Sequence, residues 1–219
     1  MKHLNDNILC VLDVETTGRN PDRHDIIDIA CIPVNHLMEV DKTKRWFDIT
    51  MKPRHDIDLA EWEALKMEYA RNTLTNDPGD QHSQKSKLNR EWITNSILQG
   101  IDPDEGAELF VAWFEKLNLP PKKRIQILGH NVIFDIGFVK SWLGEQTYEY
   151  MFDPRSRDTM IISQFINDRA DWKGEAFPFN KNNLGYLAKT LQCEERVAHN
   201  SLDDCLTTLE IYRKLVRKY

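Results

Sequence analysis

The chain has 219 residues, of which 41% are hydrophobic and 29% are charged. A chain of this length and composition can bury a sizeable core, and we expect a single domain over residues 1–219. The formal net charge of −6 argues against a bulk binder of nucleic-acid duplexes, which is usually basic. The chain starts MKHLNDNILC without the pattern of a signal peptide, and no apolar run is long enough to span a bilayer. We therefore expect a soluble, unprocessed, cytoplasmic protein that does not bind membranes.

The first part of the chain predicts strands. Apolar, β-branched runs at residues 8–14, 26–34 and 45–51 are separated by short polar turns, which is typical of an antiparallel meander. A helix is expected over residues 59–70. The polar stretch at residues 72–90 has almost no large apolar residue, so we expect a surface loop there, inserted into the domain.

The second part alternates between strand and helix. Apolar residues at helical spacing predict a helix over residues 103–117, and residues 124–129 read as a buried strand. The next predicted helix, residues 131–144, ends at Gly144. Later helices are expected at residues 158–166, 182–191 and 201–216. Strands followed by this alternation predict an α/β fold, with a mixed sheet covered by helices.

The four cysteines show no Cys-x-x-Cys pair, and two of them lie in the predicted strands. Disulfides seldom persist in the cytosol, so we expect reduced and buried thiols. The four are Cys10, Cys31, Cys193 and Cys205.

Two carboxylates come at the end of the first predicted strand. A strand projects residues i and i+2 to one face, so Asp13 and Glu15 lie side by side. The plain alternative is a strand end that meets solvent. Acidic residues are depleted in strands, however, and the preceding apolar run indicates a buried strand. Mg²⁺ or Mn²⁺ would relieve the repulsion, because hard cations favour oxygen ligands.

Asp135 lies within the predicted helix 131–144. It shares a helical face with Phe138, Val139 and Trp142, which marks that face as core-facing. Burying an ionised carboxylate is costly unless it is paired or bound to metal. Alternatively, Asp135 sits in the first helical turn, where the macrodipole stabilises an anion. A metal is the stronger of the two explanations.

Three polar candidates lie at the start of the last predicted helix or just before it. Ser201-Leu-Asp-Asp204 matches a capping box, and on local grounds this purely structural explanation is the stronger one for Asp204. Asp203 points about 100° away around the helix, so only one of the two aspartates can serve a given site, and their spacing does not choose between them. His199 precedes the helix. Loop histidines are usually surface residues, but the ordinary pKa of about 6.5 makes His199 a competent general base.

Together these segments resemble the DnaQ-like superfamily of 3′-to-5′ exonucleases, in the subclass named for four acidic residues and a histidine (DEDDh). Three family motifs are matched in order, by DVETTG at residues 13–18, by HNVIFD at residues 130–135, and by His199 with Asp204 five residues later. The third motif selects Asp204 over Asp203. The sister subclass has a tyrosine where this chain has Asn200.

The resemblance implies a ribonuclease-H-like fold, a five-stranded mixed sheet whose first three strands are antiparallel. It also implies phosphodiester hydrolysis with two divalent ions, Mg²⁺ or Mn²⁺, about 3.5–4 Å apart. Asp13 would bridge both ions, and His199 would take a proton from the attacking water. Glu15 and Asp204 would hold the ion that activates water, and Asp135 would hold the other. The substrate-binding residues would be Val14, Thr16, Thr17, Asn131 and Phe134.

The expected partners are single-stranded nucleic acid 3′ ends. Two divalent ions would cancel the four site carboxylates and leave a net charge of about −2, which does not prevent the protein from gripping one strand end. The leading hypothesis is hydrolysis of single-stranded DNA to nucleoside 5′-monophosphates. The alternatives are RNA 3′-end trimming, as by an oligoribonuclease, and a catalytically silent binding subunit. Proofreading would require a polymerase partner in trans, and we expect a free-standing nuclease instead.

Overall fold

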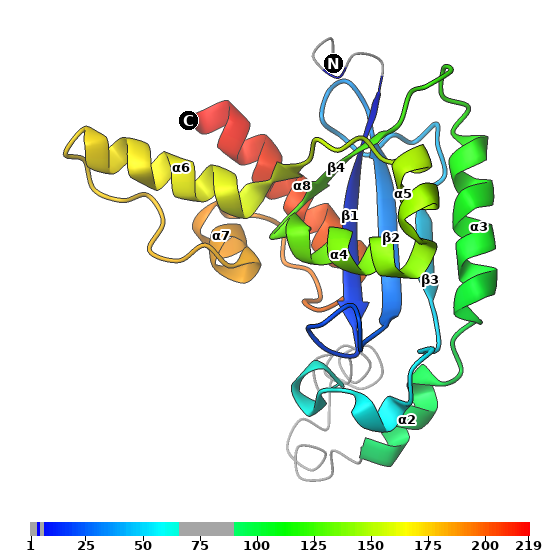
Figure 1. The fold of residues 1–219 in the computed structure, drawn as a ribbon. Coiled ribbons are helices and arrows are strands. Elements are labelled where there is room, and N and C mark those ends of the chain that lie inside the picture. The colour runs from blue at the N-terminus through cyan, green and yellow to red at the C-terminus, as the bar shows by residue number, and fades with distance from the viewer. Residues whose placement is uncertain (1–3, 5–6, 66–89) are drawn as a thin grey trace.

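The computed structural model describes residue 4, residues 7–65 and residues 90–219, and a five-stranded sheet lies at its centre (Figure 1). The strand order is β3-β2-β1-β4-β5. The strands are β1 (Ile8–Thr16), β2 (Ile26–Val34), β3 (Phe47–Thr50), β4 (Ile125–Gly129) and β5 (Arg157–Asp158).

Both kinds of strand pairing occur. β1 pairs with β2, and β2 with β3, in antiparallel fashion, whereas β4 runs parallel to both β1 and β5. In the register between β1 and β2, Glu15 lies opposite Asp28. The predicted mixed sheet and its antiparallel first three strands are therefore confirmed.

Helices cover both faces of the sheet (Figure 1). Alternation along β1 divides the core, because Cys10, Leu12 and Val14 pack towards one helical layer while Leu9 and Val11 pack towards the other. The first layer comprises α3 (Pro103–Lys116), α4 (Val132–Leu143) and α5 (Glu145–Met151), and the second is α8 (Ser201–Lys218).

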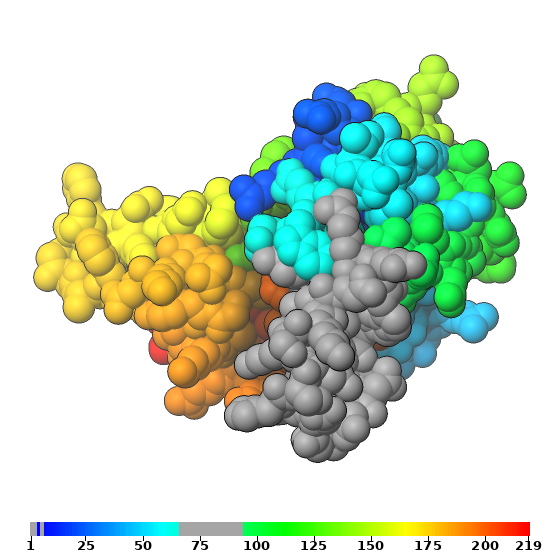
Figure 2. Space-filling view, turned by 90° about the horizontal axis from the view of Figure 1, so that it is seen from below, coloured from blue at the N-terminus to red at the C-terminus, as the bar shows by residue number. Residues whose placement is uncertain are grey.

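An arm projects from the sheet and is formed by α6 (Thr159–Trp172) and α7 (Leu184–Thr190) (Figures 1 and 2). A separate apolar cluster joins this arm to α8, with Ile166 of α6, Leu187 of α7 and Leu215 of α8 as buried members. The remaining elements are the short η2 (Ile57–Leu59) and α2 (Arg90–Ile97).

The predicted helices at 103–117, 131–144, 158–166, 182–191 and 201–216 are confirmed within a few residues, except that α6 extends to Trp172. Gly144 ends α4 with a φ of 77°, as predicted, but the chain starts α5 immediately afterwards, which was not predicted. The helix predicted at 59–70 is helical at residues 62–65, whereas Leu59 ends η2 and Ala60, its cap, is extended, so the predicted start was wrong by three residues. Residues 66–70 lie outside the described residues. The predicted loop at 72–90 also lies outside the described residues, apart from residue 90, which begins α2.

The four cysteines are free thiols, as predicted, and all but Cys193 are buried. Among the helices of the described ranges, none combines the length and the apolarity that crossing a bilayer requires.

Candidate active site

The predicted site residues of β1 lie between two helices. Asp13 and Glu15 follow Leu9 and Val11 on the same side of the strand, which is the side that α8 covers. Both carboxylates are partly buried, because β1 runs out of the core at this end. The alternation read from the sequence therefore directs both side chains towards the start of α8.

Asp135 approaches the same strand end from α4. Its side chain is 3% exposed and shares the buried face of α4 with Phe138 and Trp142, as predicted. One carboxylate oxygen accepts a hydrogen bond from the backbone N–H of Val14 over 3.0 Å. Asp135 also lies in the first turn of α4. The core-facing position and the first-turn position, which the sequence offered as alternatives, are therefore both present. Burial raises the pKa of Asp135 to about 8, although the Val14 hydrogen bond favours the charged form.

The start of α8 differs from the predicted capping box. The helix is capped by the side chain of Asn200, which accepts the N–H of Asp203, so Ser201 is already the first helical residue. The carboxylate of Asp204 accepts the backbone N–H of His199 over 3.1 Å and does not reach back to Ser201. The prediction was wrong by one residue because asparagine is as good a cap as serine.

Three predicted site residues converge there. One ligand atom each from Glu15, His199 and Asp204 lie within 4.8 Å of one another. Asp203 is not a member of this group, and its carboxylate instead accepts the backbone N–H of Val197. His199 has a left-handed backbone with a φ of 60°, and its side chain is exposed at the edge of the group.

The carboxylates of the site repel one another. The pKa of Asp13 is raised well above its ordinary value, first by burial and then by the charges of Asp135, Glu15 and Asp204. Burial also raises the pKa of Asp204 to about 6 and lowers the pKa of His199. Cations between these groups would stabilise their charged forms. The carboxylate oxygens of the site suit Mg²⁺ or Mn²⁺, because these hard cations favour oxygen ligands, so the four carboxylates fit the predicted metals.

A hollow of about 380 Å³ adjoins the carboxylates. Four of the five predicted substrate-binding residues line it, namely Val14, Thr16, Asn131 and Phe134, and Glu15 lines it as well. The remaining wall comes from Gly18, the last residue of the first motif, and from four residues that the sequence did not indicate: Arg19, Glu61, Glu63 and Ala64. Seen from below, the blue loop after β1, the cyan segment after β3 and the orange segment before α8 lie on one face (Figure 2).

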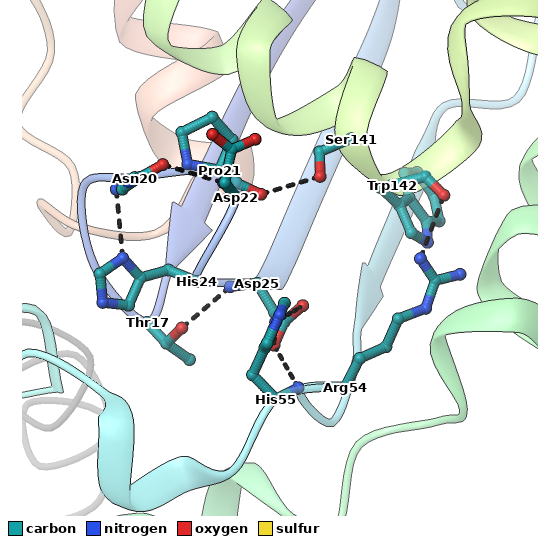
Figure 3. A network of polar contacts seen from close by, with 10 residues as sticks. All are labelled: Thr17, Asn20, Pro21, Asp22, His24, Asp25, Arg54, His55, Ser141 and Trp142. Carbon is teal, nitrogen blue, oxygen red and sulfur yellow. Dashed lines mark hydrogen bonds and ion pairs between the residues drawn. The ribbon is translucent and has the colours of Figure 1, made fainter.

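Thr17, the fifth predicted substrate-binding residue, is not among the lining residues. It is 3% exposed, and its hydroxyl accepts the backbone N–H of Asp25 over 2.9 Å. The Asp25 carboxylate in turn contacts the ring and the backbone N–H of His55 (Figure 3). Thr17 therefore belongs to the network that holds the loop after β1 against the segment after β3.

The same network reaches α4. The hydroxyl of Ser141 donates to the backbone carbonyl of Pro21 over 2.8 Å, and Arg54 donates to the carbonyl of Trp142 (Figure 3). On the hollow side, Glu61 accepts the backbone N–H of Arg19 and pairs with its guanidinium. These bonds fix the position of the wall that Arg19 and Glu61 contribute.

Two buried or bridging carboxylates near the site were missed by sequence reasoning. Asp28 is 1% exposed in β2 and accepts hydrogen bonds from the hydroxyls of Ser201 and Thr50. The sequence feature that could have identified Asp28 is its place as an acidic residue inside an otherwise apolar strand. Asp158 caps α6 and also bonds the start of α4. The position of Asp158 at the start of a predicted helix indicated that it could cap α6. It did not indicate the bonds to the start of α4.

A family model described as exonuclease, RNase_T, matches residues 80–212. Among curated proteins, the chain is similar to the DNA polymerase III PolC-type of Staphylococcus aureus (strain bovine RF122 / ET3-1), with 24% identity over 219 residues. This match covers 98% of the chain but only 12% of the relative.

Two solved structures of E. coli exonuclease I share the fold. A complex with a dT13 oligonucleotide superimposes with a TM-score of 0.65 at 17% identity, and a zinc-bound complex with single-stranded DNA superimposes with 0.67 at 15% identity. Each match covers 97% of this chain and 41% of the other. The predicted ribonuclease-H-like fold is therefore confirmed.

Proposed function

Because the chain belongs to the exonuclease family, we propose that it is a metal-dependent 3′-to-5′ exonuclease that hydrolyses single-stranded DNA ends to nucleoside 5′-monophosphates. Family membership confirms the predicted resemblance to DnaQ-like exonucleases and the assignment as an enzyme. The observation that carries the mechanism is the cluster of Glu15, His199 and Asp204 beside the hollow.

Four carboxylates would hold two divalent ions, Mg²⁺ or Mn²⁺, in this proposal: Asp13, Glu15, Asp135 and Asp204. When bound, the ions supply positive charge that stabilises the phosphorane-like transition state and lowers the pKa of the attacking water. The raised pKa values of Asp13 and Asp204 support the assignment, because crowded carboxylates need positive charge to stay ionised. E. coli exonuclease I, which shares the fold, has been solved with a bound zinc ion, which supports the use of a divalent cation.

His199 is the general base of the proposal. The water oxygen forms a bond to phosphorus, its proton passes to the His199 ring, and the bond from phosphorus to the 3′ oxygen of the preceding nucleotide breaks. The leaving 3′ oxygen takes up a proton from solvent, so the products are a nucleoside 5′-monophosphate and a strand with a new 3′ hydroxyl. The exposed ring of His199 suits this task, because its protons must return to solvent after each cycle.

The hollow would hold the 3′-terminal nucleotide. Phe134 would stack on the base, which suits an enzyme that accepts any sequence, since every base has a π-face. Asn131 would contact the sugar and phosphate, while Val14 and Thr16 would line the opposite side. DNA is favoured over RNA because the similar exonuclease I structures contain DNA oligonucleotides and the curated relatives are DNA polymerases.

The chain spans 12% of the length of the PolC-type relatives. We propose a nuclease that acts on free 3′ ends. Proofreading by this chain would require a DNA polymerase as a partner in trans.

A direct test is incubation with single-stranded DNA and RNA of one sequence, each labelled at the 5′ end, with Mg²⁺ or Mn²⁺ and with or without a chelator. The proposal expects a ladder of DNA shortened from the 3′ end, release of nucleoside 5′-monophosphates, and no reaction with chelator. Attack from the 5′ end, or hydrolysis in chelator, would contradict it. Faster hydrolysis of the RNA would make RNA the substrate.

A further inference from the structure

Asn131 is an unusual helix cap. It is the N-cap residue of α4, yet its side chain makes no capping hydrogen bond. Its backbone is left-handed, with φ of 60° and ψ of 41°, and its side chain is exposed and lines the hollow. N-cap asparagines ordinarily use their side-chain oxygen to accept a backbone N–H of the first turn. Here Asn131 lines the hollow, and its side chain does not cap the helix.

Asp158 accepts the first two backbone N–H groups at this end of α4. Its Oδ2 accepts the N–H of Val132 over 2.9 Å, and its Oδ1 accepts the N–H of Asn131 over 3.0 Å. The same Oδ1 also accepts the N–H groups of Met160 and Ile161 at the start of α6. One carboxylate therefore caps two helices, α4 beside the hollow and α6 of the arm.

The surroundings hold Asp158 in place. It is the last residue of β5 and pairs in register with Gly129 of β4, two residues before Asn131. The next residue, Thr159, donates to the carbonyl of Gly129 and contacts the ring of His130. Two strand ends and two helix starts thus meet at the Asp158 carboxylate, so its position determines where the backbone of Asn131 lies.

We propose that Asp158 is a positioning residue that acts through Asn131, holding its amide towards the sugar and phosphate of the 3′-terminal nucleotide. The inference rests on the proposed function. A left-handed backbone is disfavoured for residues other than glycine, although asparagine tolerates it better than most, and it persists only when neighbouring contacts impose it. The bond from Asn131 N–H to Asp158 is such a contact. Without it, the amide would be free to turn back and cap α4.

Two substitutions of Asp158 separate its roles. Asp158→Ala removes both caps. Asp158→Ser retains an oxygen that can cap α6, because serine is a good N-cap, but a single short hydroxyl cannot also bond Asn131 and Val132. We expect Asp158→Ala to lower the Tm by about 3–6 °C, and Asp158→Ser to recover at least half of that loss.

The decisive readout is steady-state hydrolysis of single-stranded DNA. We expect Asp158→Ser and Asn131→Ala each to raise KM about tenfold, with kcat changed by less than about threefold, because the loss of one polar contact to the bound nucleotide corresponds to about this factor. The double variant Asn131→Ala, Asp158→Ser should be no worse than either single variant, because both remove the same contact.

Asp102→Ala is the matched control. Asp102 caps α3 by accepting the N–H of Asp104, and α3 carries none of the residues that line the hollow. This variant should lower the Tm and leave KM unchanged. It therefore distinguishes the loss of a helix cap from the displacement of Asn131. The inference is overturned if Asp158→Ser restores both Tm and KM, or if the KM effects of Asn131→Ala and Asp158→Ser multiply. Wild-type protein that leaves DNA intact in Mn²⁺ would instead refute the proposed function, and this inference with it.

Discussion

The hydroxyl of Ser201 donates a hydrogen bond to the carboxylate of Asp28 over 2.9 Å, which ties the first residue of α8 to β2. Asp28 lies opposite Glu15 in the sheet register, and its other oxygen accepts the hydroxyl of Thr50. Since α8 also carries Asp204, this buried contact sets the distance between the carboxylates of β1 and the one on α8.

Ser201→Ala should therefore destabilise the protein. The substitution removes a hydrogen bond to a buried carboxylate, which typically costs about 1–3 kcal/mol of unfolding free energy. Urea denaturation measures the change. Thr43→Ala is the control, because the Thr43 hydroxyl makes a similar bond to Asp41 at an exposed position and should contribute about 0.5 kcal/mol or less. Equal losses in the two variants would show that burial of the Asp28 pair does not matter.

Asp204→Asn should abolish hydrolysis, whereas Asp203→Asn should retain at least about half of it. The group with Glu15 and His199 contains Asp204 and not Asp203. Removing a metal ligand in a two-metal site removes transition-state stabilisation, so we expect a residual rate below about 1% for Asp204→Asn. The assay is DNA hydrolysis in Mn²⁺, with circular dichroism to show that both variants are folded.

The metal dependence of Tm provides a readout that does not require activity. Mn²⁺ should raise the Tm of the wild type and of Asp203→Asn, because a ligand that binds only the folded state stabilises it. Asp13→Asn and Asp204→Asn should lose most of this rise. In chelator, both should be at least as stable as the wild type, since each removes a repelling charge. Retention of a tenth of wild-type hydrolysis by either would contradict a ligand role.

His199→Ala should slow hydrolysis by about a hundredfold or more, the usual contribution of a general base. Partial burial lowers the pKa of His199 from 6.5, so the wild-type rate should rise with pH below 6.5 and be level above it. The rate rises with pH because only the deprotonated ring of His199 can accept a proton from water. His199→Ala should lack this rise. His36→Ala, an exposed histidine in the turn after β2, should keep the wild-type profile. Identical profiles in all three proteins would place the base elsewhere.

Phe134→Ala should weaken substrate binding. The ring lines the hollow and packs on Phe138 with centroids 4.9 Å apart, so it offers a fixed face to a base. Stacking of a base on an aromatic ring contributes about 1–3 kcal/mol, which predicts a KM for single-stranded DNA raised about 5- to 150-fold. Phe165→Ala is the control, because Phe165 is exposed on α6 and does not line the hollow. A similar KM in both variants would exclude Phe134 from base binding.

Asp153 should stabilise the protein at neutral pH and lose that effect in acid. Its hydrogen bonds with Arg155 lower its pKa to about 2, below the value of about 3.9 in an unfolded chain. A lowered folded-state pKa stabilises the fold above pH 4, and the effect disappears as the pH falls to 2. Because Arg155 is largely exposed, we expect about 1–2 kcal/mol at pH 7.

Asp153→Asn tests this by denaturation at several pH values. The difference in unfolding free energy from wild type should shrink between pH 4 and pH 2. Asp168→Asn, an exposed position on α6, should differ little from wild type at any pH. A difference that does not depend on pH would mean that Asp153 acts through shape and not through its charge.

Local patterns in the sequence were sufficient for most elements and for the composition of the site. The apolar runs predicted the strands β1 and β2, and the spacing of apolar residues predicted α3, α4 and α8. Strand alternation put Asp13 and Glu15 on one face, and helical periodicity put Asp135 on a buried one. The three motifs then selected the histidine and aspartate before and within α8. The strand and helix patterns depend on neighbours a few residues apart, which is why the sequence alone reveals them, whereas the choice of Asp204 over Asp203 came from the family resemblance.

The tertiary structure decided what depends on distant partners. It placed the cap of α8 at Asn200, withdrew Thr17 from the hollow, paired Asp28 with Ser201, and made Asp158 a cap for two helices. The hydrogen bond from Ser201 to Asp28 spans 173 positions of the chain, and periodicity carries no information over such a separation. Such bonds form because packing brings two polar groups together away from water, where each must find a partner.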